Sequence, residues 1–402
     1  MLESTIWPAW PLQGNDLMRL AVALLLAAVC GEAVARVLRL PRVTGYSLAG
    51  LLMGPALLGW FGPEDLNAVR IAIDLALALL LFELGVRLDV RWFRANPWVL
   101  VSSVSEAGLA FVLTYLLMRG MGYSNGLAAT VGAIAIGTSP SVVMRVAAEL
   151  RAEGQVTQRL FVLCALNVAY SVVLSKLIVG GMHGVFRGDW LLGVLHPVYL
   201  LAGSLIVGAA LALAFQVLRR AFDLSDEQGA VVLFGLLLLT LSLLDMLRLP
   251  SMLAPLIAGA IIKYRDPRPH LWPRHFGTAG GVLVIALFML TGMSLVPAQM
   301  AAGGAAALVL LVARVVGKSA GVVLLGPVSG LSFRQAAALG LTLAPMSGMA
   351  FLLTEDIRVI YPAFGAQLAP IVLSMVAVLE LLGPVAVQWG LRIAGETRAG
   401  DK

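Results

Sequence analysis

Residues 126–148 read GLAATVGAIAIGTSPSVVMRVAA, and residues 333–354 read FRQAAALGLTLAPMSGMAFLLT. Both are apolar runs interrupted near the middle, the first at Gly137-Thr138-Ser139-Pro140 and the second at Ala344-Pro345-Met346-Ser347-Gly348. Proline removes a backbone donor and clashes with the preceding turn, so each run predicts a broken helix. A simple proline kink is the alternative. Broken helices at matching positions favour a transporter, because they expose backbone carbonyls and helix ends at mid-membrane.

The composition places the rest of the chain in the same membrane setting. Of 402 residues, 60% are hydrophobic and 12% are charged, whereas a soluble domain carries about 25% charged residues. The apolar runs are continuous, which excludes the alternating pattern of a membrane barrel. The fold class predicted is therefore an all-α polytopic membrane protein. No nucleotide-binding loop or metal cluster is found, so we expect no enzyme, no cofactor and no nucleic-acid partner.

Apolar runs between polar breaks predict thirteen transmembrane helices, with a retained first helix and no signal peptide. Nineteen Lys and Arg residues fall on one side of these spans and six on the other, which predicts a cell-membrane protein with its N-terminus outside and its C-terminus in the cytoplasm. The predicted spans are 18–38, 43–61, 68–87, 97–118, 126–148, 159–180, 193–218, 228–247, 250–264, 276–297, 302–326, 333–354 and 366–391.

Two short motifs recur in the second half of the chain in the same order. They predict two inverted six-helix repeats, at residues 18–180 and 228–391, joined by a connector helix at 193–218. Chance recurrence of short Gly- and Ala-rich motifs is the alternative. The first pair is Arg39-Leu40-Pro41 with Leu48-Ala49-Gly50 against Arg248-Leu249-Pro250 with Ile257-Ala258-Gly259, and the second is Phe82-Glu83-Leu84-Gly85 against Met289-Leu290-Thr291-Gly292.

An ordered set of motifs resembles the monovalent cation:proton antiporters, of the Kef and Nha types. This resemblance implies an Na⁺/H⁺ antiporter-like fold that exchanges Na⁺ or K⁺ for protons, with a dimerisation panel and a mobile core. It also implies a homodimer in the lipid bilayer. The motifs are Leu40-Pro41 to Tyr46, Gly54-Pro55, Leu80 to Gly85 with Asp89, Thr138-Ser139-Pro140, Arg314 to Lys318, and Pro345 to Gly348.

The chain departs from this family at the residues that usually bind the ion. The family commonly has an acid in the sixth helix, but here Asn167 is followed by Val168. The second break often ends in Gly-Glu, but here Gly348 is followed by Met349. Kef-type proteins also carry a cytoplasmic nucleotide-binding domain, and we expect none within residues 1–402, which form a single transmembrane domain.

Three charged residues within the spans are the first candidates for the ion site, because a charge at mid-membrane is costly unless it functions or is paired. Glu83 is the expected main ligand for cation and proton, with an ion pair to Arg87 on the same helix as its structural alternative. Glu106 is expected in support, or as a packing residue. Lys318 resembles the family lysine that pairs with the missing acid, so Glu106 or Glu83 must replace that partner.

Neutral and supporting ligands complete the predicted site. Thr138, Ser139 and Asn167 carry oxygens that can replace the water around a cation, although small hydroxyl residues also cap broken helix ends. Arg314, Cys164 and Ser347 are expected to support them, and no metal is expected beyond the transported cation. Both cysteines lie in apolar runs and are expected to be buried thiols. Glu32, Asp245 and Glu380 match no motif and are interpreted as structural or interfacial residues.

Two other functions remain open at this point. A relative that has lost the acid could be transport-inactive and act as a membrane scaffold or sensor. A transporter of another solute, such as an anion attracted by Arg314 and Lys318, is the third hypothesis. For the exchanger, the loss of one acid predicts one-for-one, electroneutral exchange, because a single carboxylate holds either a proton or a cation.

Overall fold

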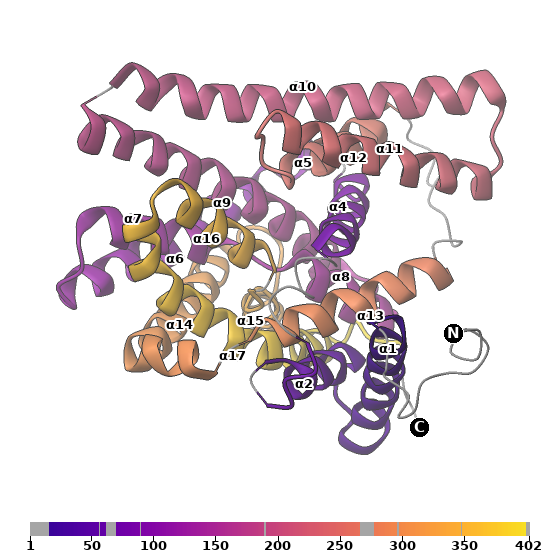
Figure 1. Cartoon of the computed structure of the whole chain (residues 1–402), viewed down its shortest axis with the longest axis horizontal. Coiled ribbons are helices and arrows are strands. Elements are labelled where there is room, and N and C mark those ends of the chain that lie inside the picture. The colour runs from indigo at the N-terminus through magenta and orange to yellow at the C-terminus, as the bar shows by residue number, and fades with distance from the viewer. Residues whose placement is uncertain are drawn as a thin grey trace, which may run out of the picture.

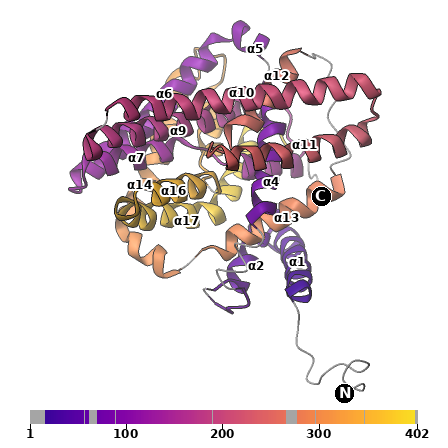
Figure 2. The same cartoon turned by 45° about the horizontal axis from the view of Figure 1, so that its top comes forward.

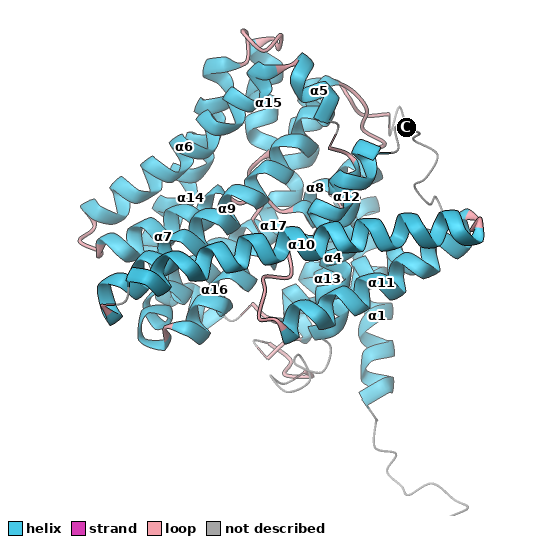
Figure 3. Cartoon of the chain, turned by 90° about the horizontal axis from the view of Figure 1, so that it is seen from above, coloured by secondary structure: helices cyan, strands magenta, loops and turns pink. Residues whose placement is uncertain are grey.

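The computed structural model describes residues 16–55, 57–61, 70–88, 90–188, 190–265, 277–295, 297–346 and 348–398. Within these ranges the chain forms helices joined by short turns, and none of the described residues lies in a strand (Figure 3). The predicted all-α class is therefore confirmed.

The helices of the first half follow the predicted spans, with a short extra helix before α6. Because Gly137, Thr138 and Ser139 are not helical, the fifth span is divided between α7 and α8. The elements are α1 (Asp16–Ala33) with a π-helical turn η2 (Val34–Leu38), α2 (Arg42–Met53), α4 (Arg70–Val86), α5 (Val90–Ala95), α6 (Pro97–Gly120), α7 (Asn125–Ile136), α8 (Pro140–Glu149) and α9 (Gln155–Arg187).

The second half has the same organisation after a long connecting helix. Its twelfth span is divided between α15 and α16, with the break at Leu343 to Met346 in the described chain. The elements are α10 (Trp190–Phe222), α11 (Asp226–Met246), α12 (Leu253–Arg265), α13 (Gly277–Met293), α14 (Pro297–Leu325), α15 (Phe333–Thr342), α16 (Gly348–Ile360) and α17 (Pro362–Ala394).

Eight spans among the described residues are long and apolar enough to cross a membrane, with α1 and η2 counted as one span and α7 and α8 as another. On the outside of the molecule, large apolar side chains such as Leu191, Ile206 and Val217 of α10 are exposed. A water-facing helix would not present such a surface over this length, so these side chains face lipid. The protein is a multi-pass membrane protein.

The helices divide into two groups that the connector α10 spans (Figure 1, Figure 2). The first group, here called the panel, contains α1, α2, α4, α11, α12 and α13, in which α4 packs on α12 and α2 packs on α13. The second group, here called the core, contains α6 to α9 and α14 to α17. The two groups meet where α2 lies against α17 and where α4 lies against α8.

Glycines at the two helix crossings of the panel show a symmetric arrangement. A side chain at Gly50 on α2 would meet the backbone of Met289 on α13, and one at Gly259 on α12 would meet the backbone of Phe82 on α4. These glycines belong to the two recurring motifs of the sequence. Each copy of the first motif packs against the copy of the second motif that comes from the other half of the chain. Such packing is what a two-fold relation between inverted repeats produces.

Candidate ion-binding site

The site is organised around the two helix breaks, which cross in the middle of the core. Ser139 caps α8, since its hydroxyl accepts from the backbone N–H of Val142, and Pro140 occupies the first turn, where its missing donor is harmless. The backbone N–H of Ser139 donates to the carbonyl of Pro345 at 3.0 Å. The two breaks therefore support each other directly, and each leaves carbonyl groups without helical partners.

Arg314 on α14 satisfies these carbonyls. Its guanidinium is fully buried and donates to the carbonyls of Ala135 at 2.8 Å and Gly137 at 2.6 Å in the first break. It also donates to Leu343, Ala344 and Pro345 in the second break. Because α7 and α15 end here with the negative ends of their dipoles, the guanidinium balances partial negative charge from both helices. The planar group with five donors suits this task better than an ammonium.

Lys318, one turn further along α14, forms an ion pair with Glu106 on α6. The distance from Lys318 Nζ to Glu106 Oε2 is 3.0 Å, and both side chains are fully buried. A buried lysine left alone would be strongly unfavourable, and this carboxylate removes that cost. The structure thus brings together two of the predicted site residues and identifies Glu106 as the partner that replaces the missing acid.

Neutral predicted residues connect this pair to the breaks. The Asn167 amide on α9 donates to the Thr138 hydroxyl at 3.2 Å, and that hydroxyl donates to the carbonyl of Leu343 at 3.2 Å. The Cys164 thiol lies 3.6 Å from the carbonyl of Thr138. The side chain of Asn167 also lies close to the Glu106 carboxylate. The chain of contacts therefore runs from the first break through Asn167 to the ion pair.

Several oxygens in this region are buried without a hydrogen-bond donor. They are Oε1 of Glu106, Oδ1 of Asn167 and the hydroxyl oxygens of Ser102 and Ser171. Most buried polar atoms in proteins are paired, and carboxylate, amide and hydroxyl oxygens are ligands that hard cations prefer, so these four atoms are candidate cation ligands. Ser171 was not predicted, although its position four residues after Asn167 places both on one face of α9.

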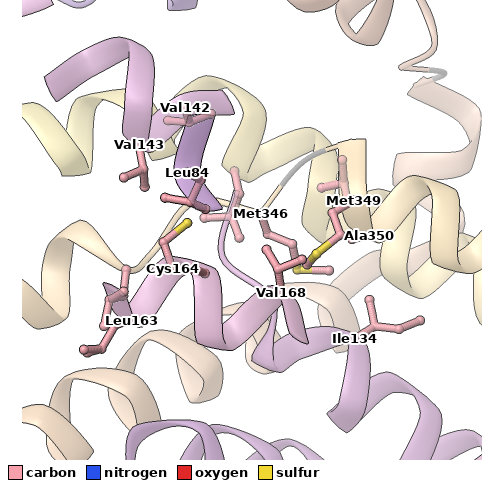
Figure 4. Packing of buried hydrophobic residues seen from close by; sticks show 14 of the residues in the cluster. Leu84, Ile134, Val142, Val143, Leu163, Cys164, Val168, Met346, Met349 and Ala350 are labelled. Atoms are coloured by element: carbon pink, nitrogen blue, oxygen red, sulfur yellow. The ribbon is translucent and has the colours of Figure 1, made fainter. Parts of the chain in front are cut away.

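Apolar side chains fill the positions where the family has its acids. Val168 is fully buried in a cluster with Ile134, Met346 and Met349, as Figure 4 shows. Met349 also lies against Gly137 of the first break. A carboxylate at either position would lie among the apolar side chains of this cluster, where an ionised group is costly. The carboxylate that pairs with Lys318 comes from α6 instead.

Glu83 lies outside this constellation. Its carboxylate forms an ion pair with Arg87 at 2.9 Å, one turn along α4, and its side chain is 23% exposed. The Arg87 guanidinium in turn lies 4.7 Å from the centre of the Phe161 ring, which fixes its direction. This is the structural alternative that the spacing of the two residues suggested. Ser347 lies outside the described residues.

Comparison with known proteins shows the family of the chain. The model of the transmembrane sodium/hydrogen exchanger family matches residues 21–392. The chain belongs to this family, within the monovalent cation:proton antiporter superfamily.

Solved structures show the same fold. A structure of the sodium proton antiporter MjNhaP1 from Methanocaldococcus jannaschii at pH 8 matches 95% of this chain and 100% of that chain, with a TM-score of 0.72 and 17% identity. An electron-microscopy structure of the same antiporter matches 96% and 100% of the two chains, with a TM-score of 0.73 and 17% identity. At this identity the likeness concerns the fold.

One relative matches only part of the chain, and its name gives iron as its cargo. The chain is 32% identical over 132 residues to the iron transporter MagA of Paramagnetospirillum magneticum, a stretch that covers 33% of this chain and 30% of that protein. The chain thus spans under a third of the length of this relative.

Proposed function

We propose that the protein exchanges Na⁺ or K⁺ for protons by alternating access, and that the cation binds at the carboxylate of Glu106 while the proton is carried by Lys318. The observation that carries this proposal is the buried pair of Glu106 and Lys318, in which Oε2 accepts from the ammonium while Oε1 has no donor. A carboxylate that keeps one oxygen free in a buried polar site can accept a cation, and the adjacent ammonium supplies a proton to release.

The exchange step follows from competition at this carboxylate. A monovalent cation reaches Oε1, and the ammonium of Lys318 then loses its counter-charge. The neutral amine is the favoured form of a buried lysine without a partner. Lys318 therefore releases one proton to water as the cation binds, and it recovers a proton when the cation leaves. One positive charge enters for each one that departs, so the exchange is one-for-one and electroneutral.

Neutral oxygens around Glu106 complete the coordination in this proposal. Asn167 Oδ1 and the hydroxyl oxygens of Ser102 and Ser171 are buried acceptors that can contact a cation, and Thr138 holds the Asn167 amide in place. Hard monovalent cations prefer such oxygen ligands. Cys164 and Ser139 keep the first break in its shape, and Arg314 holds both breaks together.

The role first expected of Glu83 is assigned in this proposal to Glu106. The Glu83 carboxylate has a cation partner on its own helix and a partly exposed side chain, whereas Glu106 is fully buried among the residues of the breaks. Alternating access would move the core against the panel, with the panel forming the contact of a homodimer. The proposed orientation keeps the N-terminus outside and the C-terminus in the cytoplasm.

Anion transport has less support from the same geometry. The two cationic side chains on one face of α14 already have partners among the described residues. Arg314 binds backbone carbonyls and Lys318 binds Glu106. An anion would have to displace these contacts before it could bind. The site therefore favours a cation as the cargo.

Purified protein in liposomes tests the exchange. Pulses of Na⁺ or K⁺ outside should raise the internal pH in liposomes with protein and leave it unchanged in protein-free liposomes. The rate should not change when a membrane potential of either sign is imposed, because no net charge moves. A rate that follows the potential would contradict the one-for-one exchange. A folded protein that moves no protons with any cation would support the scaffold hypothesis.

A further inference from the structure

Glu380, in the middle of α17, is a second fully buried carboxyl group, which is not part of the ion pair of Glu106 and Lys318. It lies where the core meets the panel, and its Oε1 is contacted from two panel helices. The Ser47 hydroxyl on α2 donates to this oxygen at 3.2 Å, and the Thr291 hydroxyl on α13 lies 2.9 Å from it. Its other oxygen, Oε2, is buried and has no hydrogen-bond partner among the described residues.

The hydroxyl of Thr291 shows how a proton fits into this arrangement. Its oxygen lies 2.9 Å from Glu380 Oε1 and 3.1 Å from the carbonyl of Phe288, but a hydroxyl has only one proton to donate. When Glu380 is protonated, it donates to Thr291 and Thr291 donates to Phe288, so both contacts are hydrogen bonds. When Glu380 is ionised, Thr291 must turn toward it and the contact with Phe288 is lost.

Glu380 also lacks a cation that would stabilise its ionised form. Only the Ser47 and Thr291 hydroxyls act on this carboxyl among the described residues, and α13 carries no titratable side chain. An ionised carboxylate buried without a counter-charge is strongly unfavourable. Among the residues with described side chains, the titratable groups on the helices packed against α17 are Arg42 and Tyr46 on α2, Arg145 and Glu149 on α8, Arg159, Cys164, Tyr170 and Lys176 on α9, Arg314 and Lys318 on α14, Arg334 on α15, and Glu355, Asp356 and Arg358 on α16, while α7 carries none.

A second contact shows that Glu380 belongs to an extended seam between α2 and α17. The Gln388 amide donates to the carbonyl of Arg39 at 2.9 Å. Gln388 follows Glu380 by eight residues, and Arg39 precedes Ser47 by eight, so the two contacts are separated by about 12 Å along antiparallel segments. Movement of the core against the panel must break both of them.

We propose that Glu380 is a second proton-binding site, which holds the α2–α17 seam closed when protonated and releases it when ionised. The ligand is a proton taken from water and returned to water. In the ionised state, separation of α17 from α2 lets water reach the carboxylate and removes the cost of its burial. The proposal rests on the proposed function only for the movement of the core. The proton itself can be detected without transport.

Hydrogen–deuterium exchange of the full-length protein tests this site. Amide exchange in α2 and α17 is measured from low to high pH in lipid nanodiscs, with labelling times scaled for the intrinsic effect of pH. In the wild type, exchange in both segments should increase by about tenfold as Glu380 ionises, because a lost buried hydrogen-bond network opens the seam. In Glu380→Gln, which stays neutral, both segments should stay protected at every pH.

The control and the second variant make the result decisive. Glu355→Gln on α16 removes a carboxylate that is paired with Arg358 at 3.3 Å, far from the seam in sequence, and should retain the wild-type response. Thr291→Val removes one hydroxyl at nearly constant shape, and should shift the pH midpoint of the response, because Thr291 bonds to Glu380 differently in its protonated and ionised forms. This variant decides the question if Glu380→Gln does not fold.

Two outcomes overturn the proposal. A pH response in Glu380→Gln equal to that of the wild type would show that another group opens the seam, and an unshifted midpoint in Thr291→Val would show the same. A wild-type protein without cation exchange would refute the proposed function, but amide exchange measured against pH would still test the proton site at Glu380. The two proposals therefore fail separately.

Discussion

The ammonium of Lys318 lies 3.0 Å from the carboxylate of Glu106, and neither side chain has any exposed surface. The two residues are 212 positions apart in the chain and come from α14 and α6, which pack against each other along their length. Glycines make this approach possible, since a side chain at Gly321 or Gly317 of α14 would collide with the backbone of α6. The pair therefore depends on close helix packing as well as on charge.

Removal of one partner of this pair should destabilise the protein more than removal of both. Lys318→Gln leaves Glu106 buried without its counter-charge, at an expected cost of about 3–5 kcal/mol in the free energy of unfolding. The double variant Lys318→Gln with Glu106→Gln should regain much of this loss. Thermal unfolding in detergent measures both, with Arg358→Gln on the exposed end of α16 as a control of at most about 1 kcal/mol. Additive losses in the double variant would contradict the pairing.

Arg314 should be sensitive even to a conservative change. Arg314→Lys keeps the charge but cannot reach carbonyls of both breaks, so at least two carbonyls lose their donors. At about 1–3 kcal/mol for each unsatisfied buried group, the expected loss of stability is several kcal/mol. Thermal unfolding and amide exchange at residues 135–139 measure this effect. A lysine variant as stable as the wild type would show that the guanidinium is not needed to hold the breaks.

Val168→Asp restores the family's usual acid but should not restore a family-type site. Val168 is fully buried beside Met346 and Met349, so a carboxylate there is ionised only at a large cost or stays neutral. We expect a loss of about 3 kcal/mol or more in stability, measured by thermal unfolding. Val168→Thr, of the same size with one hydroxyl, is the milder comparison. A stable Val168→Asp protein whose exchange becomes dependent on voltage would contradict this reasoning.

The symmetric glycine contacts predict equal effects in the two halves of the chain. Gly50→Ala and Gly259→Ala each place a methyl group against the backbone of a crossing helix, at an expected cost of about 1–3 kcal/mol. Gly108→Ala on α6 meets no neighbour within 4 Å and is the matched control, with little expected change. Thermal unfolding separates the three variants. If one of the two crossing variants behaved like Gly108→Ala, the crossings would not be equivalent.

Much of the fold could be predicted from the sequence because membrane helices leave strong local signals. Continuous apolar runs mark the helices, and proline with glycine marks both breaks, since these residues disrupt hydrogen bonds within their own turn. The packing of the Gly50 motif on the motif at Met289 could not be predicted in this way. It depends on which helices cross, and that information is distributed over the whole chain.

The site could be predicted only as a set of residues without partners. Glu83 and Arg87 satisfy each other by spacing alone, and this was the alternative visible in the sequence. The partner of Lys318 could not be decided, because Glu83 and Glu106 are both acids in apolar helices and only the packing of α6 on α14 separates them. The role of Arg314 could not be predicted for a similar reason, because its partners are backbone carbonyls, which every residue type carries.

Cation-dependent proton movement in liposomes, compared between Glu106→Gln and Glu83→Gln, decides which carboxylate binds the cation. Each change removes one carboxylate and keeps the size of the side chain. We predict that Glu106→Gln abolishes exchange of Na⁺ or K⁺ for protons, whereas Glu83→Gln, which breaks only a partly exposed pair with Arg87, retains it to within about threefold. Full exchange in Glu106→Gln, together with its loss in Glu83→Gln, would return the ion site to α4.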